Sequence, residues 1–176
     1  IMAVGVMRRR LNEAVCRIFD SADNIIYIPA GRSLLATLSV ELNDLSTTRM
    51  DLTMRECIAL IRGTRDRFGA KIPEIVKEYT KTIKGQINNV AIDQVYDLIR
   101  KILKADYTSE ADEERIYFDK HHWVKLMYGS SGQQEVLWIL MLVFVTVLEN
   151  RSSFVVIEEP EAHLFPEAQK EIIKLI

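Results

Sequence analysis

Cysteine is scarce in this sequence, and its scarcity argues against two kinds of stabilising chemistry. The two cysteines, Cys16 and Cys57, lie far apart and show neither CxxC spacing nor neighbouring histidine pairs. A disulfide framework needs more cysteines, and a structural zinc site needs ligands at short regular intervals. We therefore expect both cysteines to be small core residues of a protein that works in a reducing, cytoplasmic environment.

Neither sign of charge dominates, and no hydrophobic run is long enough to cross a bilayer. The chain has 23 Lys and Arg against 25 Asp and Glu, for a net charge of -2. This balance does not indicate nucleic acid or membrane as a general partner. The longest apolar run, Val136 to Leu148, is interrupted only by Thr146 and falls short of the roughly 20 residues of a membrane span. We expect it to form a buried helix, without membrane contact.

Glycine is also sparse, and none of the seven glycines lies in the pattern G-x-x-x-x-G-K-[ST], which forms the loop that cradles nucleotide phosphates. The stretch most similar to this pattern, Gly63 to Lys71, has the wrong spacing and no Ser or Thr after the lysine. A secretory signal is not indicated either, because the basic residues Arg8 to Arg10 follow the first apolar stretch. The chain begins at Ile1 and ends inside a helical pattern, so we expect it to be a piece of a longer protein.

The sequence does contain alternating helical and strand patterns. Periodic apolar residues predict helices over 6–19, 54–68, 72–83, 91–103 and 133–148, and β-rich runs predict strands over 24–28, 115–118 and 154–157. The strand at 115–118 is expected to pair with one near 123–127, and the acidic stretch Asp106 to Glu114 is expected to be a loop. The strand 154–157 is apolar throughout, which predicts burial on both faces, as in an α/β sheet.

Two adjacent carboxylates, Glu158 and Glu159, directly follow the strand 154–157, and Pro160 ends the run. Like charges at the end of a buried strand repel each other, so a cation or a proton transfer is expected beside them. In α/β proteins the carboxyl ends of strands are where Mg²⁺ is held and water is activated beside a nucleotide. One carboxylate would hold the metal, and the other would deprotonate the attacking water. The alternative is a solvated strand end with no ligand.

The stretch Ser130-Ser131-Gly132 immediately precedes the long apolar helix. Exposed amides at a helix start, with small residues and serine hydroxyls around them, can bind a phosphate group by donating hydrogen bonds to it. The alternative is an ordinary helix N-cap, for which serine is one of the preferred residues. Each motif alone leaves both interpretations open.

In combination, the order SSGQQ, apolar helix, FVVIEEP and Glu161-Ala-His-Leu164 resembles the head of ABC-type ATPases, with its signature motif, signature helix, Walker B strand and D-loop. The likeness is greatest to the branch containing RecF, SMC-like proteins and OLD (overcoming lysogenization defect) ATPases, which are AAA-type ATP-binding proteins. The segment Tyr27-Ile-Pro-Ala-Gly-Arg-Ser33 is similar to the Y-I-P-x-x-R-S stretch of such proteins. The resemblance covers residues 24–33 and 125–176 closely.

This resemblance implies ATP and Mg²⁺ as cofactors and a homodimer joined through an ATP sandwich, with DNA or a nuclease as a further partner. Glu158 matches the Walker B acid that holds Mg²⁺, and Glu159 matches the general base. The signature that reaches the γ-phosphate of the partner's ATP is matched by Ser130, Ser131, Gly132 and Gln133. His163 lies on the D-loop, so the resemblance places it at the dimer interface beside the nucleotide.

We expect an α/β fold with a partial ABC-ATPase-like sheet, flanking helices and a compact helical subdomain. Its three parts are an N-terminal helix and core strand (1–33), a helical insert (34–118), and the signature helix, Walker B strand and D-loop (119–176). The insert stands where SMC-like members carry coiled-coil arms, but its helices are short. Its basic residues either face DNA or solvate helix faces, and they are Arg62, Arg65, Arg67, Lys71, Lys77, Lys81 and Lys84.

Three functions are compatible with these patterns. The leading hypothesis is an ATP-hydrolysing head whose phosphate loop lies outside this segment, so that the segment alone is inactive. The second is a non-catalytic protein-interaction module derived from such a head, in which the phosphate loop never existed. A metal-dependent nuclease centred on Glu158, Glu159 and Glu161 is less favoured, because no Asp-x-Asp motif or lysine cluster accompanies these acids.

Overall fold

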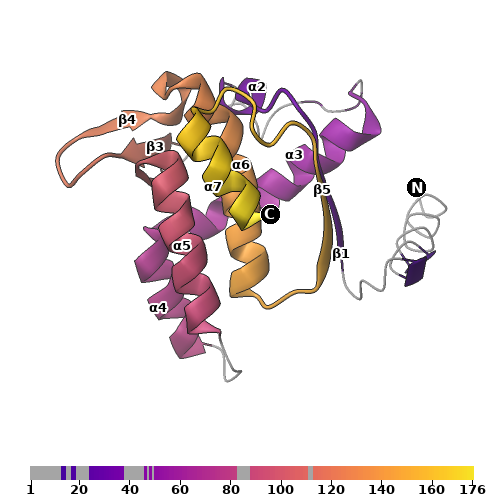
Figure 1. Cartoon of the computed structure of the whole chain (residues 1–176), viewed down its shortest axis with the longest axis horizontal. Helices are drawn as coiled ribbons and strands as arrows, with labels where there is room; N and C mark the ends of the chain where they lie inside the picture. Colours follow the sequence, from indigo (N-terminus) through magenta and orange to yellow (C-terminus); the bar gives the residue numbers. More distant parts are fainter. Residues whose placement is uncertain are drawn as a thin grey trace.

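The computed structural model of the chain describes residues 13–14, 17–18, 24–37, 46, 48, 50–82, 88–110 and 113–176. The helices are α2 (Ser33–Thr37), α3 (Leu52–Arg65), α4 (Ile72–Thr82), α5 (Asn89–Leu103), α6 (Ser131–Leu148) and α7 (Pro166–Leu175), with the 3₁₀ turns η2 (Asp66–Phe68) and η3 (Leu126–Tyr128). The strands are β1 (Asn24–Ile28), β2 (Asp106–Glu110), β3 (Glu113–Tyr117), β4 (Trp123–Lys125) and β5 (Ser153–Ile157) (Figure 1). Most of the predicted helix over 6–19 lies outside the described residues, and its described residues, 13–14 and 17–18, are helical. Cys16 lies outside the described residues. The mixed α/β class is confirmed.

β1 and β5 pair in parallel, in a register that sets Ile28 opposite Ile157. These strands are far apart in sequence, and α6 leads into β5 (Figure 1). The strand predictions for 24–28 and 154–157 are confirmed. The predicted burial of β5 on both faces is wrong for the described structure, because Val156 is 38% exposed. The described residues therefore cover the face of β5 that carries Val156 only in part.

α6 is the central helix of the fold. Its side chains from Leu137 to Met141 are fully buried, as expected for a helix that is apolar on every face. The helix begins with a capping box, in which Ser130 and Gln133 bond to each other's backbone amides. By length and composition α6 could cross a membrane, but 67% of it is buried inside the fold, as in the core helix of a compact domain.

The helices between β1 and α6 pack onto this central helix. α5 contacts both α6 and α7, and α3 contacts both β1 and α6. Ile61 of α3 and Ile99 of α5 are buried in one hydrophobic cluster that also holds Trp138 of α6. The middle third of the chain is therefore a compact set of short helices that shares its core with the rest, and in the described residues it carries no long arm.

The expected loop from Asp106 to Glu114 is wrong, because this stretch forms β2 and the start of β3. Acidic composition suggested solvent exposure, yet Glu114 is buried beneath the hydroxyl of Tyr107, which donates to it at 2.6 Å. The guanidinium of Arg65, on α3, lies 3.4 Å from the same carboxylate. A buried carboxylate needs such partners, and neither partner can be identified from local composition.

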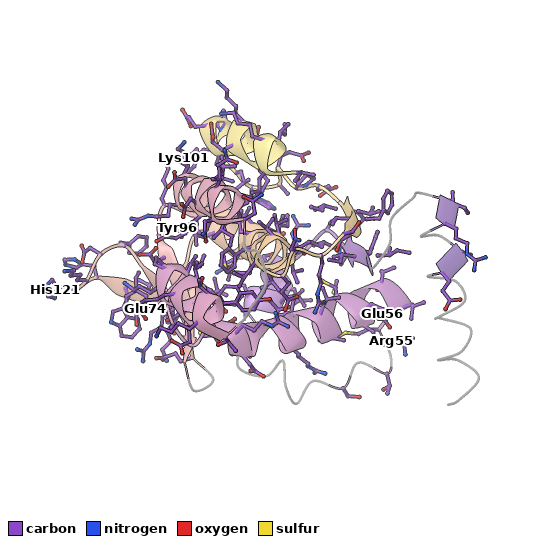
Figure 2. All side chains as sticks on the ribbon, turned by 90° about the horizontal axis from the view of Figure 1, so that it is seen from below. Arg55, Glu56, Glu74, Tyr96, Lys101 and His121 are labelled. Carbon is purple, nitrogen blue, oxygen red and sulfur yellow. The ribbon has the colours of Figure 1, made fainter. Side chains whose placement is uncertain are left out.

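The predicted pairing of a strand near 115–118 with one near 123–127 is confirmed as β3 with β4, although Leu126–Tyr128 is a 3₁₀ turn rather than strand. The guanidinium of Arg115 lies over the ring of Trp123, at 4.4 Å from its centroid. Figure 2 shows His121 at the tip of this hairpin, away from the helices. The hairpin leads through η3 directly to the start of α6.

Candidate functional site

The carboxylate pair follows the carboxyl end of β5, at the end of the molecule where α6 begins (Figure 1). The amide of Glu158 donates to the carbonyl of Ile28 at 2.9 Å, so the ladder between β1 and β5 continues into the turn. The side chain of Glu158 accepts a hydrogen bond from the Tyr27 hydroxyl and another from the amide of Ala30 at 3.1 Å. The Tyr27 bond first, then the Ala30 bond, lower the pKa of Glu158. An oriented, ionised carboxylate results.

Glu159 is exposed and has a φ of 44°, in the left-handed region that non-glycine residues rarely adopt. A residue held in this region costs of order 1–3 kcal/mol, so the surrounding contacts must maintain it. The carbonyl oxygen of Glu159 accepts from Arg32 Nη2 at 3.0 Å and from the amide of Ala162 at 3.1 Å. Within the described residues no hydrogen bond holds the carboxylate itself, so the backbone turn sets its direction.

Arg32 is fully buried beneath this turn and was not among the predicted site residues, although it belongs to the Y-I-P-x-x-R-S segment. Its guanidinium makes four hydrogen bonds to backbone carbonyl oxygens, which belong to Pro29 (2.7 Å), Glu158 (2.8 Å), Glu159 (3.0 Å) and Glu135 (2.8 Å). Burial lowers the pKa of Arg32 and the negative charge of Glu135 opposes that shift, but a guanidinium stays protonated at neutral pH. Arg32 therefore joins the end of β1, the carboxylate turn and α6.

Glu135 is the second buried charge of the site. Its carboxylate accepts from the amides of Arg32 at 2.9 Å and Ser33 at 3.0 Å, which lie at the start of α2. It also lies 3.6 Å from Arg32 Nε, with both side chains almost completely buried. Sequence reasoning missed this residue. The available signal was one acid inside an otherwise apolar helix, because a buried charge needs a partner of opposite sign.

The serine turn divides into a capping part and an exposed part. The Ser130 hydroxyl accepts from the amide of Gln133 at 3.3 Å, and the Gln133 side chain accepts from the amide of Ser130 at 3.0 Å. Gln133 also donates to the carbonyl of Leu103 at 3.0 Å, which ties the turn to α5. The N-cap interpretation thus describes Ser130 and Gln133, whereas Ser131 is exposed and its hydroxyl makes no hydrogen bond within the described residues.

The loop after the carboxylates packs directly on the start of α6. A Cβ atom added to Gly132 would lie 2.6 Å from the carbonyl oxygen of His163 and 3.3 Å from a methyl carbon of Leu164. His163 itself has a φ of 59° and an exposed side chain. This contact brings the two sequence motifs together: the carboxylate loop passes over the first turn of the helix that the serine turn begins.

A family model of the AAA ATPase domain matches residues 17–176, nearly the whole chain. The chain belongs to the AAA ATPase domain family. Comparison with curated proteins and with solved structures finds no match. At the level of the family, the AAA ATPase domain binds and hydrolyses ATP, which agrees with the resemblance at this coarser level.

AAA ATPase domains generally bind ATP together with Mg²⁺, and the residues present fit such a magnesium site. Mg²⁺ is usually bound by one or two carboxylates, with phosphate oxygens and water completing its coordination. Glu158 supplies an exposed, ionised carboxylate at the end of a strand. Among the described residues no group of three or more His, Cys, Asp and Glu side chains forms a metal cage. A metal shared with a triphosphate needs no such cage.

The basic residues of the middle helices are largely engaged elsewhere. Four of the seven form ion pairs, in which Arg65 contacts Glu114, Arg67 contacts Glu149, Lys71 contacts Asp106 and Lys81 contacts Glu78. Lys84 lies outside the described residues. These ion pairs agree with charges that stabilise or solvate the helices, and contact of this basic set with DNA stays a prediction.

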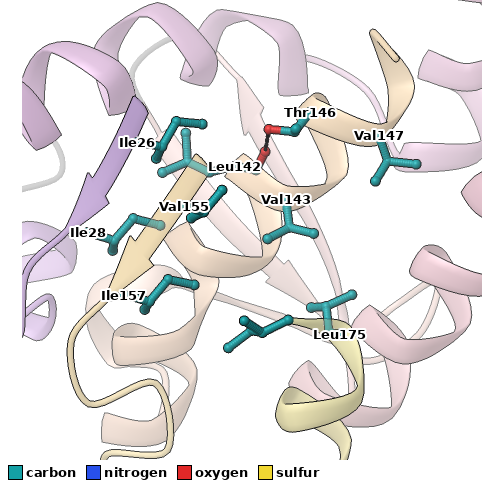
Figure 3. Close-up of a pocket in the computed structure, with 10 residues that line it drawn as sticks. Ile26, Ile28, Leu142, Val143, Thr146, Val147, Val155, Ile157 and Leu175 are labelled. Carbon is teal, nitrogen blue, oxygen red and sulfur yellow. Dashed lines mark hydrogen bonds between the residues drawn. The ribbon is translucent and has the colours of Figure 1, made fainter. Parts of the chain in front are cut away.

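Two cavities of the described structure lie away from the carboxylates. One, of about 120 Å³, has an apolar lining of Ile26, Ile28, Leu142, Val143, Thr146, Val147, Val155, Ile157, Leu175 and Ile176 (Figure 3). The other, of about 320 Å³, lies between η2, α4 and the end of α6. Neither contains the carboxylate turn, and both Glu158 and Glu159 are exposed at the edge of the fold.

Proposed function

We propose that this chain is the part of an ABC-type ATPase head, of the RecF and OLD-like branch, that carries the catalytic carboxylates and the signature turn. The observation that carries the proposal is the placement of Glu158 and Glu159 at the carboxyl end of a parallel strand, next to the exposed start of α6. The carboxyl edge of a parallel sheet is where α/β proteins bind nucleotides.

In this proposal each acid has a separate task. Glu158 holds Mg²⁺ beside the triphosphate, and the bound metal would neutralise charge that develops on the phosphate oxygens. Glu159 orients a water molecule and accepts its proton as the water attacks. The exposed carboxylate of Glu159, which no hydrogen bond holds within the described residues, suits a group that must exchange a proton with solvent.

The serine turn serves a second head in the proposed ATP-joined homodimer. Exposed Ser131, with the amides of the first helical turn, faces the partner's γ-phosphate, and His163 lies at the interface beside it. Ser130 and Gln133 hold the turn in shape through the capping box, and Gly132 lets the carboxylate loop approach. The glycine-rich phosphate loop would come from sequence outside this chain, because none of the seven glycines of the chain lies in such a pattern.

Replacement of Glu159 by Gln in the full-length protein tests the proposal. The amide keeps the size of the side chain but cannot accept a proton, so ATP hydrolysis should fall at least about 100-fold. ATP binding should persist and the protein should accumulate as an ATP-bound dimer, measured by light scattering with and without Mg·ATP. Glu161→Gln is the matched control, because Glu161 is an exposed acid two residues along the same loop that has no role in the proposal. Unchanged turnover in Glu159→Gln would remove Glu159 from the mechanism.

One observation favours the non-catalytic alternative: no phosphate loop occurs within the 176 residues. A titration of the full-length protein with Mg·ATP separates the two functions, since an interaction module predicts no binding. Cleavage of DNA that depends on Mg²⁺ but not on ATP, and that is lost in Glu161→Gln, would instead identify a nuclease. Pull-down with DNA and with candidate nucleases in the presence of ATP tests the expected further partner.

A further inference from the structure

We propose that Arg32 is a positioning residue for the catalytic turn, and that Glu135 holds Arg32 in place, so that the pair connects the carboxylates to the helix bearing the signature turn. This inference rests on the proposed function, because it assigns Arg32 a role through Glu159. Neither residue would touch nucleotide, since both side chains are buried.

The first step of the argument is the set of acceptors that Arg32 reaches. Two of its four carbonyl partners are consecutive, Glu158 at 2.8 Å and Glu159 at 3.0 Å. The other two, Pro29 at 2.7 Å and Glu135 at 2.8 Å, lie after β1 and on α6. The planar guanidinium presents its donors in a fixed fork, so it constrains the direction of several carbonyl groups at once.

The second step concerns the conformation of Glu159. Its left-handed backbone, with a φ of 44°, is intrinsically unfavourable and persists only where neighbouring contacts maintain it. The hydrogen bond from Arg32 Nη2 to the carbonyl of Glu159 is such a contact. Without this bond, Glu159 can rotate about its N–Cα bond to an ordinary negative φ. This rotation also changes the direction of the Cα–Cβ bond. The carboxylate would then leave the position from which it accepts a proton.

The third step concerns what holds Arg32 itself. Glu135 neutralises the buried guanidinium and at the same time accepts from the amides of Arg32 and Ser33, which fixes the backbone around Arg32. The backbone carbonyl oxygen of Glu135 also accepts a hydrogen bond from Arg32 Nε. Glu135 lies in the second turn of α6, so the network extends to the helix that begins at the serine turn.

A purely structural buried ion pair elsewhere in the fold provides a control. Arg65 and Glu114 are as deeply buried, with the Nε of Arg65 3.4 Å from the carboxylate, and they join α3 to β3 rather than to the carboxylate turn. If burial of a charged pair only stabilises the fold, conservative changes at Arg32 and at Arg65 should have the same kind of effect. If Arg32 positions Glu159, only the change at Arg32 should alter turnover per bound ATP.

The experiment is a double-mutant cycle in the full-length protein, with Arg32→Lys, Glu159→Gln and the combination, and with Arg65→Lys as control. Lysine keeps the charge but lacks the planar fork. We expect Arg32→Lys to lower kcat about 10- to 100-fold, because a displacement of about 1 Å in a reacting group has an effect of that size. The KM for ATP should stay within about threefold of wild type. In the Glu159→Gln background, Arg32→Lys should cause no further loss, measured in single turnovers with radiolabelled ATP.

Several outcomes would overturn the inference: an unchanged kcat in Arg32→Lys, an equal loss in both backgrounds, or an equal loss of kcat in Arg65→Lys. If Arg32→Lys does not fold, Glu135→Gln answers the same question, with an expected loss of kcat of at least about tenfold at unchanged KM. Unchanged turnover in Glu159→Gln alone would remove Glu159 from the mechanism of the proposed function, and the inference would fail with it. A large loss in Glu159→Gln combined with normal turnover in Arg32→Lys would refute only the inference.

Discussion

At the scale of single residues, the turn before α6 assigns different tasks to two adjacent serines. Ser130 is the N-cap, and its hydroxyl accepts from the amide of Gln133, whereas Ser131 is exposed at the first helical position. The capping interpretation therefore applies to Ser130, and the phosphate-site interpretation stays a proposal for Ser131. Separate substitutions can distinguish a residue that stabilises the helix from one that faces a ligand.

Ser130→Ala should lower the free energy of unfolding by about 0.5–2 kcal/mol, because it leaves a first-turn amide without its acceptor. Ser131→Ala should change that free energy by less than about 0.5 kcal/mol, as an exposed substitution, and yet weaken ATP-dependent dimerisation. Urea unfolding measures the first quantity, and light scattering of the full-length protein with Mg·ATP measures the second. If both variants lose the same stability and Ser131→Ala does not change dimerisation, the turn only caps the helix.

Cys57 provides a test of burial at the same scale. Burial raises the pKa of its thiol to about 11, while the positive charge of Arg32 opposes the shift. Because the thiolate is the reactive form, Cys57 in a Cys16→Ser background should react slowly with iodoacetamide at neutral pH and rapidly in urea. Fast modification of the folded protein would contradict the burial.

The same shift has a consequence for stability. A thiol whose pKa is raised in the folded state contributes its full stabilisation below its unfolded pKa, about 8.5, and loses it as the pH rises toward the folded value. The urea midpoint should therefore fall as the pH is raised from 8 to 11. Cys57→Ala should remove this part of the pH dependence.

At the scale of elements, the close approach of the carboxylate loop to α6 depends on the absence of a side chain at Gly132. The carbonyl of His163 occupies the space where a Cβ would stand. Gly63, on α3, is the opposite case, because a Cβ there would meet nothing within 4 Å. The two helical glycines thus differ in the space available for a Cβ atom.

Gly132→Ala should destabilise the fold by about 1–3 kcal/mol, the usual cost of inserting a group into packed space. Gly63→Ala should stabilise it by about 0.5–1 kcal/mol, since alanine lowers the entropy lost on forming a helix. Urea unfolding of both variants gives the comparison. Stabilisation in both would mean that the loop can move away from α6 at little cost.

The elements also show where local patterns succeed and fail as predictors. The helices α3 to α6 follow the predicted ranges closely because apolar residues recur at helical spacing and because Asp51, Asn88 and Ser130 cap three of them. β2 and the start of β3 were predicted as loop because their acidic residues look solvated. Glu114 is in fact buried against Arg65 and Tyr107, which are distant or unremarkable in sequence.

At the scale of the whole molecule, one hydrophobic cluster includes residues from both the middle helices and the carboxylate-bearing part of the chain. Such a shared core should unfold in a single step. The side chains of α5 then contribute to the stability of the region around the candidate site, although none of them belongs to it.

Ile99→Ala should destabilise the chain by about 2–5 kcal/mol, the typical cost of truncating a buried aliphatic side chain. In a Trp123→Phe background, the fluorescence of the remaining Trp138, buried on α6, reports on the core. The urea midpoints from this fluorescence and from circular dichroism should fall together. Two separate transitions would indicate that the middle helices fold as an independent domain.

The sequence by itself determined the helices α3 to α6, the two strands of the parallel sheet and the two motifs of the candidate site, because these depend on local spacing and on residue type. The tertiary structure alone decided how the motifs are held: the four carbonyl bonds of Arg32, the charge of Glu135 beneath α2, the left-handed turn at Glu159 and the contact of His163 with Gly132. Most of these contacts join residues that are remote along the chain, such as Arg32 with Glu135 and Glu159. Their energies arise from burial and from hydrogen-bond direction in three dimensions, which no local pattern of residues encodes.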